Sequence, residues 1–152
     1  MTIRLGLVGR HIQNSLSPVL HHAAARSLGM RLEYDLIDIE KESLNTLIER
    51  LRQGDWLGLN VTAPYKEVVM SSLDQISPGG TRVSAINTIL QLSDGCLRGE
   101  NTDLLGFLVL VESHPWASAL ILGGGGAARV AVDVLSRISL GSITVAAATS
   151  TQ

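Results

Sequence analysis

Hydrophobic and polar positions along the chain switch repeatedly between the two periods that distinguish strands from helices. Residues 3–8 form an apolar stretch typical of a buried strand, and residues 32–39 alternate well enough to predict a second strand. Between them, Ser17 and Pro18 favour the start of a helix that ends near Leu28. A serine hydroxyl can cap free N–H groups, and proline suits the first helical position.

The same alternation continues through the middle of the chain. The next segment predicts an amphipathic helix, because four apolar residues share one face at i, i+3, i+4 and i+7: Leu44, Leu47, Ile48 and Leu51. The following elements are expected to be a short strand over 58–61, a helix from Pro64, a loop over 75–80, a hairpin of residues 85–92 and 96–99, and a helix over 104–111 closed by His114-Pro115. This order of strands and helices indicates an α/β fold.

The last part of the chain predicts a separate strand–helix–strand unit. An apolar strand over 118–122 is followed by four glycines, a helix over about 127–137 and a further strand over 142–147. An open nucleotide-binding sheet usually has about six strands in two such halves. The sequence therefore predicts an incomplete Rossmann-like unit.

Composition narrows the function to small-molecule chemistry. Hydrophobic residues make up 45% of the chain, enough for a core, and the net charge of −2 comes with scattered basic residues and only 3% aromatics. That balance excludes a basic, aromatic nucleic-acid surface. The apolar run at 107–111 is too short to span a bilayer, and no signal peptide is expected at the N-terminus. Cys96 is the single cysteine, which excludes an internal disulfide or a cysteine-built zinc site and suits a cytoplasmic location.

The four consecutive glycines, residues 123–126, are a candidate binding turn for a cofactor. They lie between a strand and a helix, where backbone N–H groups and the helix N-terminus can hold a pyrophosphate. A flexible linker between domains is the alternative interpretation. The end of the following strand, where NAD-binding proteins place an acidic residue and NADP-binding proteins an arginine, reads Ala147-Ala148-Thr149-Ser150. The choice between the two cofactors therefore stays open.

Three further segments, residues 14–18, 60–66 and 99–103, place polar side chains in predicted loops. Each has a structural explanation, since Ser17, Thr62 and Asp103 can each cap a helix. A lone lysine such as Lys66 is most often simply solvated. Taken together, however, the hydroxyls and amides suit a polyhydroxylated substrate, and a lysine with a carboxylate can move a proton.

In this order, the segments resemble the shikimate dehydrogenase family. The family's Ser-x-Ser-Pro turn with a following histidine matches residues 15–18 and His21, and its Asn-Val-Thr-x-Pro-x-Lys motif matches residues 60–66. Its Asn-Thr pair matches residues 87–88, and its Asn-Thr-Asp-x-x-Gly motif matches residues 101–106. Its glycine turn is similar to residues 123–127. The resemblance covers nearly the whole chain.

The resemblance implies reversible, NADP-dependent reduction of 3-dehydroshikimate to shikimate, a step of aromatic amino acid biosynthesis. It places Lys66 beside the reacting oxygen with Asp103 as its partner. Carried over by position, the substrate-binding residues are Ser15, Ser17, Asn60, Thr62, Asn87 and Asp103. The cofactor-binding residues are Gly123, Gly124, Gly125, Gly126 and Ala127. No metal is implied.

The resemblance also implies an architecture. We expect a three-layer substrate-binding domain with a mainly parallel sheet over 1–103, a connecting helix over 104–116, and an incomplete NAD(P)-binding Rossmann-like unit over 117–152. Family members continue past this point, so the chain is expected to be a fragment that is inactive alone, although its first part should fold by itself. A homodimer is a further expectation. Two alternatives stay open: an NAD-using quinate/shikimate dehydrogenase, and a non-catalytic shikimate-binding module.

Overall fold

The computed structural model describes residues 2–113, 115–138 and 141–147. The strands of the larger unit are β1 (Thr2–Gly9), β2 (Arg31–Asp38), β3 (Gly58–Val61), β4 (Gln75–Ile76), β5 (Thr88–Gln91) and β6 (Leu97–Glu100). Its helices are α1 (Ser17–Ser27), α2 (Leu44–Arg52) and α3 (Pro78–Val83), with short 3-10 helices η1 (Lys41–Ser43) and η2 (Val68–Ser72). The chain continues through α4 (Asp103–Val111), β7 (Ser118–Leu122), α5 (Gly126–Leu135) and β8 (Ser142–Ala146).

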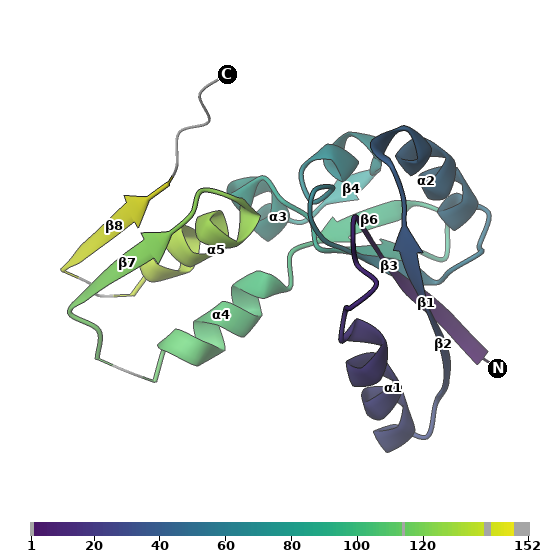
Figure 1. The fold of residues 1–152 in the computed structure, drawn as a ribbon, viewed down its shortest axis with the longest axis horizontal. Helices are drawn as coiled ribbons and strands as arrows, with labels where there is room; N and C mark the ends of the chain where they lie inside the picture. Colours follow the sequence, from purple (N-terminus) through teal and green to yellow (C-terminus); the bar gives the residue numbers. More distant parts are fainter. Residues whose placement is uncertain (1, 114, 139–140, 148–152) are drawn as a thin grey trace.

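The strands of the larger unit form one mixed sheet in the order β2-β1-β3-β5-β6-β4 (Figure 1). Strand β1 runs parallel to β2 and β3, and β4 runs parallel to β6. Strand β5 is antiparallel to both of its neighbours, and a tight turn connects it to β6. The expected α/β fold with a mainly parallel sheet is confirmed.

Helices cover both faces of this sheet. Val8 and Val61 are neighbours on adjacent strands, and both belong to the core cluster that contains the four apolar residues of α2. One position earlier, Leu7 lies beside Asn60 on the opposite face. This second face is covered by α1, whose His21 ring stacks on Tyr34 of β2. Helices α1 and α2 therefore lie on opposite sides of the strands, as Figure 1 shows, and the unit has three layers.

Strands β7 and β8 form a separate parallel pair joined by α5, which confirms the predicted strand–helix–strand unit. Its core is shared with the larger unit, because Val83 and Ala85 pack in one cluster with Val130 and Val134 of α5. Arg129 adds polar contacts, donating from Nε to the Val83 carbonyl at 2.8 Å and pairing with Glu67. The glycine turn before α5 is thereby held against the larger unit.

Several local predictions were wrong. Pro64 lies inside a turn that the Tyr65 N–H closes on the Thr62 carbonyl at 3.0 Å. The helical turn starts only at Val68. Residues 75–80 are not a loop but contain β4 and the start of α3. Ser77 caps that helix by accepting from the Gly80 N–H at 3.2 Å. This is the capping role that the sequence Ser17-Pro18 had predicted for Ser17.

The third correction concerns Ser17 itself. Helix α1 has Leu16 at its N-cap and no side-chain capping bond. The Ser17 N–H instead donates to the hydroxyl of Ser15 at 3.2 Å. In addition, the first strand of the predicted hairpin begins at Thr88 rather than at Ala85. The Ser17 hydroxyl is consequently available for another partner.

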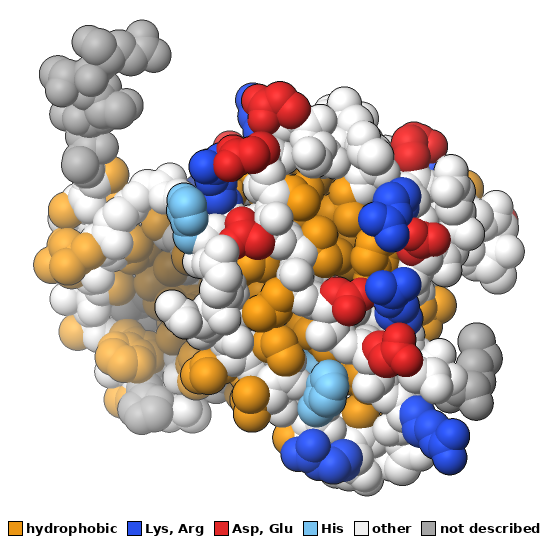
Figure 2. Space-filling model, turned by 45° about the vertical axis from the view of Figure 1, so that its right-hand side comes forward, with side chains coloured by type: hydrophobic (Ala, Val, Ile, Leu, Met, Phe, Trp, Pro, Cys, Tyr) orange, Lys and Arg blue, Asp and Glu red, His pale blue; other side chains and the backbone are white. Residues whose placement is uncertain are grey.

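Charged side chains of both signs are interspersed over the face of the larger unit that Figure 2 shows, without a single-sign patch. In the part of the chain that the structure describes, no helix is long and apolar enough to cross a membrane.

Candidate active site

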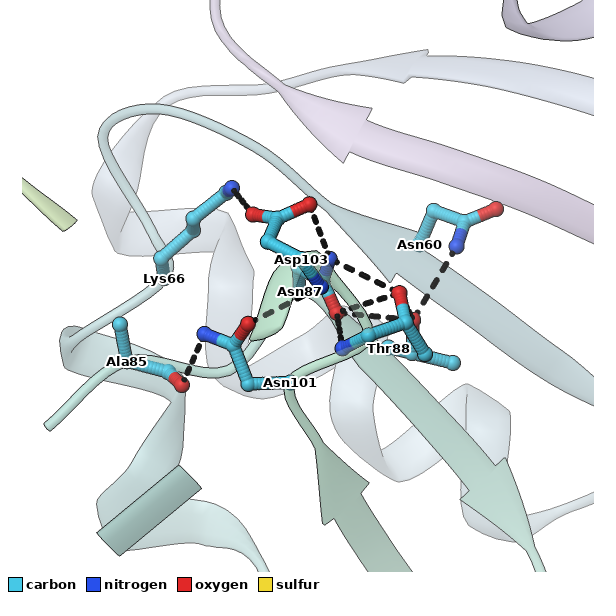
Figure 3. A network of polar contacts seen from close by, with 8 residues as sticks. Asn60, Lys66, Ala85, Asn87, Thr88, Asn101 and Asp103 are labelled. Atoms are coloured by element: carbon cyan, nitrogen blue, oxygen red, sulfur yellow. Dashed lines mark hydrogen bonds and ion pairs between the residues drawn. The ribbon is translucent and has the colours of Figure 1, made fainter. Parts of the chain in front are cut away.

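Lys66 and Asp103 meet at the junction between the two units (Figure 3). Lys66 lies in the turn after β3, and Asp103 is the first residue of α4. The Lys66 Nζ atom lies 2.7 Å from Asp103 Oδ2. The lysine backbone is anchored as well, because its carbonyl accepts from the Ile86 N–H at 2.7 Å. The lysine side chain is 24% exposed and that of the aspartate 40%, so the ion pair is within reach of a ligand.

Asn87 holds the other oxygen of the same carboxylate. Its buried amide donates from Nδ2 to Asp103 Oδ1 at 2.8 Å and to Thr102 Oγ1 at 3.0 Å. Its Oδ1 accepts from the Thr102 N–H at 2.9 Å and from the Thr88 hydroxyl at 3.0 Å. With both carboxylate oxygens engaged, Asp103 has a fixed orientation. Its backbone N–H also donates to Asn101 Oδ1 at 3.1 Å.

Asn60 extends the network along the edge of the sheet. Its Nδ2 faces the Thr88 hydroxyl at 3.4 Å, and its Oδ1 accepts from the Tyr34 hydroxyl at 2.8 Å. Burial raises the pKa of Tyr34 to about 12, and a hydrogen bond with Ser17 offsets part of that increase. Figure 3 shows the chain of contacts from Asn60 through Thr88 and Asn87 to the ion pair.

The two predicted serines lie in the turn before α1 and at its first residue. Ser15 donates its hydroxyl to Ser17 at 3.1 Å. Burial raises the pKa of Tyr34, and Ser17 is the group that offsets part of this increase. The turn before them is held by Asp38 at the end of β2, whose carboxylate accepts from the N–H groups of His11 at 3.1 Å and Ile12 at 3.2 Å. The serine turn is thus fixed to the same strand that carries Tyr34.

Thr62 lies directly after β3, with its N–H on the Val8 carbonyl at 2.9 Å. Gly9 is needed beside it, because a Cβ at that position would lie 2.4 Å from Thr62 Cγ2. Thr62 caps no helix, since the segment from Pro64 is a turn. Its side chain is half-buried at the carboxyl end of β3, next to the strand position of Asn60.

The glycine turn has the features that a pyrophosphate requires. Gly123 has φ +119, a conformation that favours glycine, and a Cβ at Gly123 or Gly125 would meet no atom within 4 Å. Helix α5 then starts at Gly126 without a side-chain cap, so N–H groups at its N-terminus, including that of Ala127, are open to an anion. Gly126 lies against Lys66: a Cβ there would be 3.8 Å from Lys66 Cδ.

The sequence segment expected to choose between cofactors falls largely outside the described residues, which end at Ala147. Ala147 itself lies beside the glycine turn, 3.2 Å from where a Cβ of Gly124 would stand. An alanine offers no charged or hydrogen-bonding group to a ribose or its phosphate.

Sequence reasoning missed the residues that connect the predicted ones. Thr88, Asn101 and Thr102 were part of motifs but had no role assigned, whereas Tyr34 and Asp38 were outside every motif. Tyr34 lies on a predicted strand, where an aromatic residue indicates core packing. Its hydroxyl contact with Asn60 depends on which strands are neighbours in the sheet, and the local sequence does not determine that order.

Comparison with known proteins shows the family to which the chain belongs. The sequence model described as "Shikimate dehydrogenase substrate binding domain" matches residues 7–89, so the chain belongs to the shikimate dehydrogenase family through that domain. The shikimate dehydrogenase (NADP(+)) of Methanothermobacter thermautotrophicus is 41% identical over 143 residues, covering 92% of this chain and 50% of the relative. That of Moorella thermoacetica is 38% identical, covering 93% and 49%. The chain spans about half the length of the curated relatives it matches.

Solved structures agree as well. Shikimate 5-dehydrogenase from Thermus thermophilus, in complex with NADP(H) and shikimate, superposes with a TM-score of 0.85 at 35% identity, covering 94% of this chain and 56% of that chain. Quinate dehydrogenase from Corynebacterium glutamicum, in complex with NAD, gives a TM-score of 0.83 at 30% identity, covering 95% and 54%.

Proposed function

We propose that this chain supplies the substrate-binding part, and the start of the nucleotide-binding part, of an NADP-dependent shikimate dehydrogenase that interconverts 3-dehydroshikimate and shikimate. The observation that carries the proposal is the 2.7 Å pair of Lys66 and Asp103, set between the amide of Asn87 and the glycine turn. A non-catalytic binding module would not need an ion pair held at the point where substrate and cofactor domains meet.

Lys66 is the acid–base group in this proposal. Reduction of a ketone leaves negative charge on its oxygen, and an ammonium beside that oxygen stabilises the charge and donates the proton. In the oxidation direction, the neutral amine takes the proton from the alcohol. Asp103 holds the ammonium in place, and its carboxylate is a hydrogen-bond acceptor for a neighbouring substrate hydroxyl.

The remaining residues orient a polyhydroxylated ring. Asn60 and Asn87 supply amide groups from β3 and from the residue before β5, and Ser15, Ser17 and Thr62 supply hydroxyls from two turns. Asn60 and Thr62 lie at the carboxyl end of β3, which pairs with β1 and β5. The serine turn follows β1 in the chain, and Asn87 directly precedes β5. A substrate with several hydroxyls and a carboxylate suits such donors and acceptors.

The cofactor is assigned to the glycine turn. Gly123, Gly124, Gly125, Gly126 and Ala127 would hold the pyrophosphate of NADP through backbone N–H groups. When bound, the nicotinamide cofactor supplies or accepts the hydride. The contact of Gly126 with Lys66 puts this turn next to the acid–base group, as the reaction requires.

Two measurements test the proposal. Shikimate is titrated into the 152-residue chain by calorimetry, and shikimate oxidation is assayed in a chimera whose residues 1–147 are continued by the second half of the Methanothermobacter relative. Saturable shikimate binding and NADPH formation are the expected results. A chain that does not bind shikimate, together with a chimera that turns over neither shikimate nor quinate, would refute it.

A second candidate is an NAD-using quinate/shikimate dehydrogenase. It is favoured by Ala147 beside the glycine turn, which offers no cation to a 2′-phosphate, and by the likeness to the quinate dehydrogenase bound to NAD. Comparing NAD with NADP on both acids separates the two. The division into domains at 103–104 and 116–117, a homodimer and a cytoplasmic location belong to the proposal as well.

A further inference from the structure

Tyr34 lies at the centre of the polar network, although it is outside the motifs that carry the family resemblance. Its side chain is 9% exposed. It starts on β2, opposite Leu5 of β1, and reaches across β1 to Asn60 on β3. It therefore connects α1, through the stacked ring of His21, with the amide of Asn60.

The direction of the hydrogen bond between Tyr34 and Asn60 is defined by its geometry. The Tyr34 hydroxyl donates to Asn60 Oδ1 at 2.8 Å, because an amide oxygen can only accept. A phenol has one proton, so Tyr34 uses that proton on Asn60.

This direction determines what Asn60 offers to a ligand. Because Oδ1 is taken by Tyr34, Nδ2 faces Thr88 at 3.4 Å, a long contact for an N–H donor. The amide nitrogen has two protons, so at least one donor remains for a substrate oxygen. If the amide were turned over, it would present an acceptor instead.

The tyrosine is itself held in place. The ring of His21 stacks on it, with centroids 4.5 Å apart and an interplanar angle of 16°. Burial raises the pKa of Tyr34 to about 12, so the hydroxyl keeps the proton that it donates.

We propose that Tyr34 is a positioning residue of the substrate site: its buried hydroxyl fixes the side-chain amide of Asn60 with the N–H groups toward the substrate. The inference rests on the proposed function, because it assumes that Asn60 contacts shikimate. Tyr34 acts through Asn60 and does not touch the reacting atoms.

A double-mutant cycle tests this directly. Shikimate affinity is measured by calorimetry for the unsubstituted chain, Tyr34→Phe, Asn60→Ala and the double variant. Phenylalanine keeps the ring and its contact with His21 but removes the donor. We expect Tyr34→Phe to weaken shikimate binding about tenfold alone, and to have no further effect once Asn60 is alanine.

Tyr65→Phe is the matched control. Tyr65 is the chain's other tyrosine; it is also buried, and its hydroxyl donates to the Ile39 carbonyl. It belongs to the core cluster on the α2 face of the sheet. Its loss should lower the unfolding temperature while leaving shikimate affinity within about twofold.

The outcomes distinguish a failure of the Tyr34 role from a failure of the proposed function. If the unsubstituted chain binds shikimate and Tyr34→Phe binds it equally well, the role of Tyr34 is overturned while the proposed function stands. Equal weakening in both Asn60 backgrounds also overturns it, because Tyr34 would then act by packing alone. If the unsubstituted chain does not bind shikimate and the chimera is inactive, the proposed function fails and this inference fails with it.

Should Tyr34→Phe not fold, the unsubstituted protein decides. A crystal structure with shikimate that keeps the Tyr34–Asn60 bond, with the Asn60 amide within hydrogen-bond distance of the ligand, supports the proposal. An Asn60 amide that bonds the ligand without Tyr34, or that does not contact the ligand, overturns it.

Discussion

Gly126 lies against Lys66, so that a Cβ on the glycine would stand 3.8 Å from Lys66 Cδ and 3.4 Å from the Cβ of Ala85. The contact joins the first residue of α5 to the turn after β3. The contact places the start of α5 beside the ion pair of Lys66 and Asp103.

A larger side chain at Gly126 should therefore disturb the lysine. Gly126→Val adds branched carbons beyond a Cβ that would already touch Ala85 and Lys66, so the lysine side chain has to shift, and we expect turnover in the chimera to fall about tenfold to a hundredfold. Gly106→Val, also a helical glycine but with no atom within 4 Å of its Cβ position, is the control. Equal activity of the two variants would contradict the contact.

Replacing Lys66 by alanine should reduce turnover far more than substrate affinity. The ammonium is proposed to act on charge that develops during the reaction, so its loss should lower kcat about a hundredfold or more, with shikimate affinity changed only a few-fold. Lys41→Ala, at an exposed lysine in η1, provides the control. A Lys66→Ala variant with undiminished kcat would return this residue to an ordinary surface role.

Asn87 should matter for stability independently of any ligand. Its amide bonds Thr102, Asp103 and Thr88 from a buried position, so alanine would remove all of these hydrogen bonds and leave a gap where the amide is buried. We expect Asn87→Ala to lower the free energy of unfolding by about 2–3 kcal/mol. Asn45→Ala, exposed on α2, should change it by about 0.5 kcal/mol or less. Urea unfolding followed by circular dichroism measures both.

The ion pair of Arg52 with Asp74 should make the stability of the fold depend on pH. The hydrogen bond from Arg52, at 2.6 Å, and next the Leu97 N–H, at 2.7 Å, lower the pKa of Asp74. A lowered pKa in the folded state stabilises the fold above the unfolded value of about 4, and this stabilisation is lost as the pH falls further. Asp74→Asn should thus be less stable than the unsubstituted chain at pH 7, and the difference should shrink near pH 3. A difference that grows on acidification would show the opposite sign.

Residues 1–103 should fold when produced alone. The core cluster around α2 and the cluster around Tyr34 both lie within this range, whereas the third cluster combines Val83 and Ala85 with residues of α4 and α5. We expect a cooperative thermal transition and near-native circular dichroism for this fragment. A fragment without a transition would show that the α5 contacts are required for the fold.

The periodicity of the sequence was enough to place most elements. The amphipathic face of α2 and the strand, glycine turn and helix of the last unit were each predicted close to their observed bounds, because burial of one apolar face is a local property. The helix predicted from Pro64 failed because Tyr65 enters the core and closes a turn on Thr62. Helix α3 was missed because it is short and contains two glycines.

The sequence alone determined the class of fold, the membership of the family and the kinds of side chains at the site. Motifs and hydrophobic periods depend only on residues that are close together in the chain. Tertiary structure decided which of those side chains share hydrogen bonds. Lys66 meets Asp103 across 37 positions, and Tyr34 meets Asn60 across a strand that lies between them. The order and register of the strands fix such contacts, and these depend on how the whole sheet packs rather than on any one segment.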